Sequence, residues 1–422
     1  MLILLKMAFR NIQRNTRRSL LAAISVGLAL FMVIFLQGYI NGMKSSVIYN
    51  STKSESGHIQ LVTKEYLKNR RFMPITENIP DPDELIAFLR SDPAINQEVD
   101  FITERFFFGM LLQYEGNNKA AIAFGGDVEQ ERKMLMLDRA LVEGRYLSSA
   151  KDPESKEREI ILGRKVADVL KLKVGDTLKV LVSGSDYSLH IPTLKVAGIF
   201  KTGINALDDS TFQMSLQDAQ EILHTGGGSQ QILIMLKDYR QAKKVARLIQ
   251  KRLAGDGRFQ NIVAVPWDES GGFAQTMVSM EQLYNLIYIV IAFLGSFIIT
   301  NIMMMVVLER RKEIGIIKSM GFSRGEILGM FLMEGSILGL IGSISGVALG
   351  SLVSIYFMVH GIDFGSMLSD VNMPIDNVIK FIITVPGIIS TMFLGIIVAA
   401  IVSILPSRQA SKMNVVDAIK SV

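Results

Sequence analysis

The sequence predicts an α-helical membrane protein with four transmembrane helices and a large α+β extracytoplasmic domain inserted between helices one and two. The chain is hydrophobic: 49% of its 422 residues are apolar and the mean hydropathy is +0.32. It contains charge-free runs that are each longer than the roughly 20 residues needed to cross a bilayer. From Lys44 to Glu281, in contrast, 31 basic and 32 acidic residues give an ordinary soluble composition. The charge-free runs are Ser19–Met43, Gln282–Leu308, Gly335–Ile362 and Phe381–Ser407.

Basic residues outside the large domain gather on one side of these runs. Because cytoplasmic loops are rich in Lys and Arg, we expect both termini and the central loop in the cytoplasm and the large domain outside. The net charge of +5 is then explained by topology and indicates no nucleic-acid partner. The chain has no cysteine, which excludes disulfides and thiolate metal sites. The basic residues on that side are Lys6, Arg10, Arg14, Arg17, Arg18, Arg310, Arg311, Lys312, Lys318, Arg324, Arg408, Lys412 and Lys420, and Lys380 alone lies on the other side.

The chain begins with two predicted helices. In residues 1–18, apolar side chains recur on one helical face with arginines opposite, which predicts a cytoplasmic interfacial helix. Residues 19–43 predict the first transmembrane helix. This run is too long for a signal-peptide core and no small-residue cleavage site follows it, so we interpret it as a retained anchor.

The large domain, residues 44–281, predicts two subdomains. Strand and helix patterns before residue 140 are similar in kind to those after residue 229, so segments 44–140 and 229–281 are expected to form one α+β subdomain. Shorter alternating segments between them predict a second, more β-rich subdomain inserted at residues 141–228.

The rest of the chain alternates between spans and short connections. Its predicted segments are a second transmembrane helix at 282–308, a cytoplasmic coupling helix and turn at 309–328, a third transmembrane helix at 329–359, a short outer loop at 360–380, a fourth transmembrane helix at 381–407 and a cytoplasmic tail at 408–422.

The central cytoplasmic loop, ERRKEIGIIKSMGFSRGEIL, predicts a short amphipathic helix. Ile314, Ile317 and Met320 recur at helical spacing, and Gly321 is placed to end the helix. Ser323 and Glu326 form the pattern of a capping box that starts the next helix. Two interpretations stay open: a basic anchor at the lipid headgroups, or an apolar ridge that docks into a cytoplasmic partner with Arg311 and Glu313 at its rim.

The third span carries a row of small residues at four-residue spacing. Glycines spaced in this way let helix backbones approach closely, so we expect this face to pack on another span. Generic tight packing is a better explanation than a role in a pore. The row comprises Gly335, Gly339, Gly342, Ser343, Gly346 and Gly350.

The sequence shows no pattern typical of an active site. No phosphate-binding GxxxxGK[ST] loop, GxSxG nucleophile elbow or HExxH motif occurs. The histidines, His58, His190, His224 and His360, have no metal-ligand spacing. We therefore expect no catalytic residue, metal or cofactor on this chain.

These motifs resemble those of the FtsX-like permeases of ABC transporters, and most closely the lipoprotein-releasing (Lol-type) inner-membrane permeases. The segment from Ile298 to Gly350 is similar to the family's second span, coupling helix and third span, and LPSRQASKMNVVDAIK is similar to its C-terminal pattern. The resemblance implies a homo- or heterodimeric permease of the bacterial inner membrane. It implies two copies of a separate ATPase subunit, which bind ATP and Mg, docked on the coupling helix.

The resemblance also implies a lipoprotein substrate, extracted from the outer leaflet between spans one and two and passed to a periplasmic carrier. Flexible apolar side chains at the outer ends of these spans are candidates for the crevice, although contact with membrane lipid is the simpler explanation of the same pattern. Ser183–Ile191 occupies the place of the hairpin that hands over cargo. The candidate crevice residues are Phe35, Tyr39, Met43, Met277, Met280, Leu283 and Leu286.

Two other functions remain open. One is a mechanotransmitting permease of a tripartite efflux system, although such exporters usually carry their ATPase domain on the same chain. The other is an FtsX-like regulator of a periplasmic cell-wall hydrolase, against which the size of the inserted domain counts.

Overall fold

The computed structural model describes residues 2–14, 16–148, 157–364 and 375–414, and the chain divides into two compact units. The helical unit comprises Met1–Met43, Met280–Asp363 and Val378–Val422. The α/β unit comprises Lys44–Ser279 and Phe364–Asn377. Each unit has its own hydrophobic core. This organisation confirms the predicted fold class.

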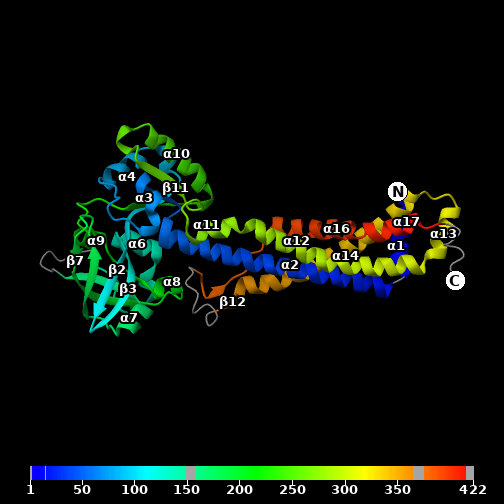
Figure 1. Ribbon diagram of the computed structural model, residues 1–422, viewed down its shortest axis with the longest axis horizontal. Helices are drawn as coiled ribbons and strands as arrows, with labels where there is room; N and C mark the ends of the chain where they lie inside the picture. The colour runs from blue at the N-terminus through cyan, green and yellow to red at the C-terminus, as the bar shows by residue number, and fades with distance from the viewer. Residues whose placement is uncertain (1, 15, 149–156, 365–374, 415–422) are drawn as a thin grey trace. The chain divides into compact units, whose positions relative to one another are not determined.

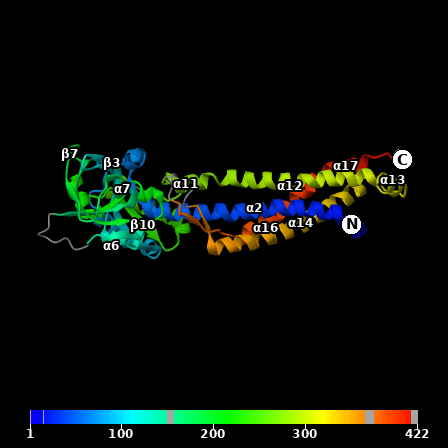
Figure 2. The ribbon, with the colours of Figure 1, turned by 90° about the horizontal axis from the view of Figure 1, so that it is seen from below.

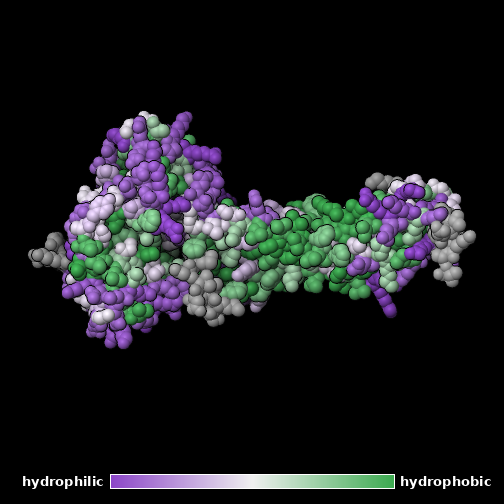
Figure 3. Space-filling view, viewed as in Figure 1, coloured by the Kyte–Doolittle hydropathy of each residue, from purple (hydrophilic) through white to green (hydrophobic). Residues whose placement is uncertain are grey.

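The helical unit is built from long helices that run alongside one another (Figure 1 and Figure 2). Hydrophobic side chains cover its long helices, as Figure 3 shows, which suits a lipid environment. Its elements are α1 (Leu2–Arg14), α2 (Thr16–Ser51), α12 (Glu281–Glu309), α13 (Arg311–Ser319), α14 (Arg324–His360), α16 (Val385–Val402) and α17 (Ile404–Lys412), with a small sheet of β12 (Ile362–Asp363) and β13 (Val378–Ile379).

Among the described residues, four helical segments are long and apolar enough to cross a membrane: Thr16–Ser56, Gly272–Glu309, Arg324–His360 and Val385–Lys412. Each extends past its charge-free run at one end or at both, where polar and charged residues continue the same helix. The fourth starts later than predicted, at Val385, since Thr384 caps it by accepting a hydrogen bond from Gly387 N and a proline follows in the first turn.

The glycine row of α14 packs on two other helices. A Cβ built on Gly346 would lie 2.2 Å from the carbonyl oxygen of Gly27, and one on Gly342 would lie 2.7 Å from Val26 Cβ, so this part of the row contacts α2. Gly350 extends that contact to Ile34. Gly339 instead faces Ala399 of α16. The row therefore allows α2 and α16 to approach the α14 backbone more closely than any side chain would permit.

The α/β unit is organised on one sheet of the strand order β11-β1-β10-β2-β3-β9-β5-β8-β6-β7, with β4 paired to β8. The strands are β1 (Ile59–Thr63), β2 (Val99–Tyr114), β3 (Asn117–Gly126), β4 (Leu141–Gly144), β5 (Arg158–Gly163), β6 (Thr177–Ser183), β7 (Leu189–His190), β8 (Thr193–Phe200), β9 (Thr211–Ser215), β10 (Gln231–Leu236) and β11 (Ile262–Pro266). The helices are α3 (Lys64–Asn69), α4 (Pro82–Arg90), α5 (Pro93–Asn96), α6 (Val128–Leu135), α7 (Arg164–Leu170), α8 (Asn205–Asp208), α9 (Leu216–Leu223), α10 (Ala242–Ala254) and α11 (Gly272–Ser279).

The long strand β2 joins two parts of this sheet. Its first half pairs with β10, whereas Leu111, Leu112 and Gln113 pair with β6 and close the path β2-β3-β9-β5-β8-β6 into a ring of strands. Phe106, Phe108 and other side chains of the second half are buried inside that ring. The predicted subdomain boundary at residue 141 is therefore wrong in detail, because the β2–β3 hairpin contributes to both cores.

Part of the predicted outer loop 360–380 also belongs to the α/β unit. Asp376 accepts hydrogen bonds from Ser46 Oγ at 2.9 Å and from Asn50 Nδ2 at 3.1 Å. These bonds join this part of the loop to the last turns of α2, which also belong to the α/β unit. Residues 365–374 of the loop lie outside the described residues.

Candidate functional site

The segments that connect the α/β unit to the first and second spans are joined to one pair of strands, β1 and β11. Strand β1 follows α2 after a single π-helical turn, Thr52–Ser56, and β11 precedes α11. The two strands pair in antiparallel register from Ile59↔Pro266 to Thr63↔Ile262. The end of α2 and the approach to α11 therefore join the same end of a two-stranded ribbon, and a displacement of either segment acts on that ribbon.

A buried arginine fastens the end of α2 to the sheet. Arg105 of β2 donates to the carbonyl oxygens of Ser54, at 2.7 Å, and Lys53, at 3.1 Å. It also forms a two-bond pair with Glu131 of α6 at 2.7 and 2.8 Å, and both side chains have 0% exposure. A buried pair persists when its donors and acceptors are satisfied in this way. We name Arg105, Glu131, Lys53 and Ser54 the stalk clamp.

Sequence reasoning did not identify the stalk clamp. The available signal was Arg105 itself, in the segment FITERFFFGM, where it stands among apolar residues of a predicted strand. Its partners come from about 26 residues later and about 51 residues earlier in the chain. Only the folded arrangement brings them together.

The predicted ridge of the coupling helix is only partly exposed. Ile314 is buried, at 1% exposure, in the core of the helical unit with Ile12 of α1 and Ala410 of α17. The exposed apolar side chains are Ile316, at 52%, and Met320, at 67%, while Ile317 is half-buried. The prediction is therefore wrong for Ile314, which packing on neighbouring helices turns inward, whereas docking through Ile317 and Met320 stays a prediction.

The predicted helix end and helix start of this loop are present, but Glu313 is paired inside the helical unit. Gly321 has φ +97°, a left-handed conformation that ends the helical segment, and the capping box of Ser323 and Glu326 is present. Arg311 is exposed. Glu313, predicted at the rim of a docking surface, instead pairs within the helical unit with Arg14 and, at 2.7 Å, with Arg310.

Polar bonds tie α13 to both ends of the chain. Besides the Glu313 pair with α1, Lys318 Nζ donates to the carbonyl oxygens of Ser411, at 2.7 Å, and Met413. Arg18 of α2 pairs with Glu309 at the end of α12. The helix α13 is therefore bonded directly to α1 and α17, and α2 is bonded to the end of α12 that precedes α13.

The predicted crevice residues differ in burial and in the unit to which they belong. Phe35 and Tyr39 pack on Phe381, with ring centroids 5.0 and 5.9 Å apart, so they belong to an aromatic cluster inside the helical unit. Met43 is half-buried. Met277 is buried, at 5% exposure, and is assigned to the α/β unit. Of the predicted crevice residues, those with exposed side chains are Met280, which caps the start of α12, and Leu283 and Leu286 of α12.

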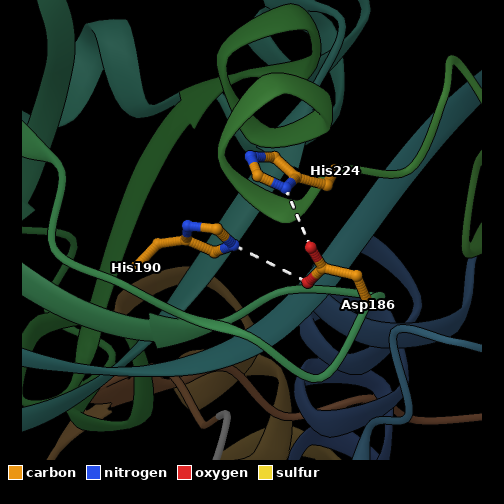
Figure 4. Close-up of side chains that lie close together, drawn as sticks. All are labelled: Asp186, His190 and His224. Carbon is orange, nitrogen blue, oxygen red and sulfur yellow. Dashed lines mark hydrogen bonds and ion pairs between the residues drawn. The ribbon is translucent and has the colours of Figure 1, made fainter.

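Three side chains at the β6–β7 turn meet closely (Figure 4). His224 Nδ1 lies 3.2 Å from Asp186 Oδ2, and His190 Nε2 lies 3.7 Å from Asp186 Oδ1. One ligand atom from each residue lies within 4.8 Å of the others, a grouping that could hold a metal ion. The sequence spacing of the histidines gives no sign of this grouping, because His190 and His224 meet only where the end of α9 returns to the turn that carries Asp186.

The described residues thus contain four candidate membrane spans, with an α/β unit between the first and the second in chain order. Residues 285–415 match the FtsX-like permease C-terminal family, and residues 19–252 match the MacB-like periplasmic core domain family. The chain belongs to the FtsX-like permeases of ABC transporters that carry a MacB-like periplasmic core domain. The family implies an ATPase partner and dimerisation.

Relatives at low identity carry different functional names. An uncharacterized ABC transporter permease of Methanocaldococcus jannaschii is 22% identical over 98% of this chain and 96% of its own length. The lipoprotein-releasing system transmembrane protein LolC of Xylella fastidiosa is 26% identical over 65% of this chain and 64% of that protein. The macrolide export ATP-binding/permease protein MacB of Neisseria gonorrhoeae is 24% identical over 98% of this chain and 60% of that protein.

Two solved structures match about half of this chain. One is the extracellular domain of the noncanonic ABC-type transporter YknZ from Gram-positive bacteria. It matches with a TM-score of 0.33 and 18% identity, over 49% of this chain and 98% of that domain. The periplasmic region of MacB from Actinobacillus actinomycetemcomitans matches with a TM-score of 0.34 and 12% identity, over 50% of this chain and 90% of that region.

Proposed function

We propose that this chain is a mechanotransmitting permease subunit that extracts lipoproteins from the outer leaflet of a bacterial inner membrane, powered by a separate ATPase subunit. The observation that carries the proposal is that the end of α2 and the approach to α11 both join the β1–β11 ribbon, and that the stalk clamp holds the end of α2. In this proposal, movement of the spans reaches the α/β unit through the two chain segments that join the β1–β11 ribbon.

The ATPase binds at the exposed face of α13 in this proposal. Ile316 and Met320 supply an apolar contact, and Arg311 and Lys312 are exposed beside them. Docking of a short amphipathic helix into a groove is a common mode of recognition. The bonds from α13 to α1 and to the chain after α17 then distribute nucleotide-driven movement across the helical unit.

Two findings support a lipoprotein as the cargo. The chain is similar to LolC, whose name gives it that role. The outer part of α12 exposes Leu283 and Leu286, at 50% and 55%, and these side chains can contact an acyl chain. After release, the lipoprotein passes to a periplasmic carrier.

Site-specific crosslinking tests the cargo. A photo-crosslinker at Leu283 is expected to capture a lipid-modified protein in cells, and the adduct should disappear when ATP and the ATPase subunit act on the complex. Ile397 of α16, with 54% exposure, is a matched lipid-facing control that should capture phospholipid only. Capture of phospholipid alone at Leu283 would contradict the cargo assignment.

A tripartite efflux system is the second candidate. The alignment with MacB extends over 98% of this chain and favours it. In that case the same mechanical coupling drives an export duct, and no substrate enters between the spans. Crosslinkers on the α/β unit would then capture a duct component, and the one at Leu283 would capture no lipoprotein.

A further inference from the structure

We propose that Asp186, His190 and His224 form a binding site for a divalent transition-metal ion of the Zn²⁺ class, which joins the β6–β7 hairpin to the end of α9. Two imidazole nitrogens and one carboxylate are ligands that zinc prefers, and a water molecule can complete a four-coordinate shell. The site is independent of the transport proposal, because it rests on these side chains alone.

The spacing of the ligand atoms matches a tetrahedral ion. With bonds of about 2.0–2.2 Å to nitrogen and oxygen, two ligands of a tetrahedral site stand roughly 3.3–3.6 Å apart. Two observed separations are close to this range: 3.2 Å from His224 Nδ1 to Asp186 Oδ2 and 3.7 Å from His190 Nε2 to Asp186 Oδ1, and one ligand atom of each residue lies within 4.8 Å of the others. The centroids of the two imidazole rings lie 4.1 Å apart. Little rearrangement is therefore needed to bring one atom of each residue onto a shared ion.

Gly184 leaves the space that the site needs. A Cβ at this position would lie 2.7 Å from Asp186 Oδ1 and 3.1 Å from His190 Nε2. Its backbone φ is not in the left-handed region, so the turn itself does not require glycine. The missing side chain instead keeps an opening beside two of the three ligand atoms.

The backbone holds the ligands in place without an ion. Gly184 N donates to the carbonyl oxygen of Ser188 at 2.9 Å, which closes the turn that carries Asp186. Ser185 bonds to the end of α9 twice, through its amide to Leu223 O and through its hydroxyl to His224 O, both at 2.7 Å. His224 itself stands in a left-handed conformation, φ 56°, as the C-cap of α9. A preorganised site loses less entropy when it binds.

Ser188 competes with the ion for the same atoms. Its hydroxyl lies 2.5 Å from both Asp186 Oδ1 and His190 Nε2. If these side chains served only to hydrogen-bond one another, their arrangement would depend on the Ser188 hydroxyl. If they form a metal site, removal of this hydroxyl should strengthen ion binding. Ser188 therefore offers a variant that separates the two explanations.

The experiment measures Zn²⁺ binding by the untagged full-length chain in detergent, in competition with a chromogenic chelator. Wild type is expected to bind one equivalent. His190→Gln and His224→Asn should each weaken binding by at least the roughly 10–100-fold that accompanies perturbation of a metal ligand. Asn suits the left-handed backbone at position 224. Gly184→Ala should weaken binding although every ligand remains, while Ser188→Ala should bind as tightly as wild type or more tightly.

Cobalt provides a second readout. Co²⁺ in place of Zn²⁺ should give the strong visible absorption of a four-coordinate ion, and this absorption should be absent in the His190→Gln/His224→Asn double variant. That variant retains His58 and His360, so it measures background binding. Equal Zn²⁺ affinity of wild type and the double variant, or loss of binding in Ser188→Ala with retention in Gly184→Ala, would overturn the proposal.

Discussion

At the scale of single residues, the stalk clamp determines how the α/β unit holds the end of α2. Arg105 has partners on a helix, α6, and on the backbone of the π-helical turn. Gly126 makes room for Glu131, since a Cβ there would lie 2.5 Å from Glu131 Cγ. The pair is thus enclosed on all sides, and removal of either partner leaves a charge without compensation.

Arg105→Leu should destabilise the α/β unit by about 3–5 kcal/mol, because it leaves the Glu131 carboxylate buried and unpaired. Denaturation of the detergent-solubilised chain, followed by the fluorescence of Trp267, measures this change. Arg258→Leu is the matched control, since its pairs with Asp256 and Glu84 are exposed and should contribute little. Equal unfolding of the two variants would contradict a structural role for the clamp.

Glu104, beside Arg105 in β2, should make stability depend on pH. Burial raises the pKa of Glu104 from its ordinary 4.5 to about 7. The folded chain therefore holds this proton more tightly than the unfolded chain, and the contribution of Glu104 to stability falls as pH rises from about 4.5 to about 7.

Glu104→Gln should remove this contribution. Denaturation midpoints measured at pH 5, 6, 7 and 8 should decline less steeply through that window in the variant than in wild type. Burial lowers the pKa of His58, and this residue is unchanged in both proteins, so the difference between the two curves isolates Glu104. Parallel curves would show that the carboxyl group has an ordinary pKa.

At the scale of elements, α13 has two faces with different tasks. The face of Ile314 holds the helix on the core of the helical unit, and the face of Ile316 and Met320 is open. Short helices gain most of their stability from such packing, so the inner face fixes the position from which the outer face is presented.

Ile316→Asp should weaken ATPase binding by several kcal/mol as an order of magnitude, because it would place a charge against an apolar groove. Pull-down of the ATPase subunit by the purified permease measures the loss, and the thermal stability of the permease alone should be unchanged. Ile314→Asp should instead lower that thermal stability. Wild-type pull-down by the Ile316 variant would refute docking on this face.

The glycine row is the second element with a definite role. Gly346→Ala would place a methyl group 2.2 Å from a backbone oxygen of α2, which cannot move away as a side chain can. We expect a loss of roughly 1–3 kcal/mol, as for other overpacked sites, and a lower melting temperature in detergent. Gly325→Ala, in the same helix, has its nearest neighbour at 4.0 Å and should have no such effect.

At the scale of the whole molecule, membrane orientation is the property that the proposed function needs. ATP is hydrolysed in the cytoplasm, so α13 must face that side and the α/β unit the other. The one-sided basic residues predict this arrangement.

Cysteine labelling tests the orientation directly, because the chain has no native cysteine. Met320→Cys and Tyr187→Cys, at positions with 67% and 80% exposure, should react with impermeant reagents from opposite sides of the membrane. In intact spheroplasts only the Tyr187 variant should be labelled. Labelling of both from outside would refute the topology.

The sequence by itself determined the class of this protein. Long charge-free runs predict membrane spans, and the capping-box pattern of Ser323 and Glu326 predicts a helix start. Both signals are local in the sequence. The tertiary structure alone decided which side chains meet. Ile314 faces inward, Arg105 reaches Ser54, and His224 returns to Asp186, each through contacts between segments that are distant in the chain. Local periodicity shows that a residue is apolar or polar, whereas its partner depends on packing across the whole fold.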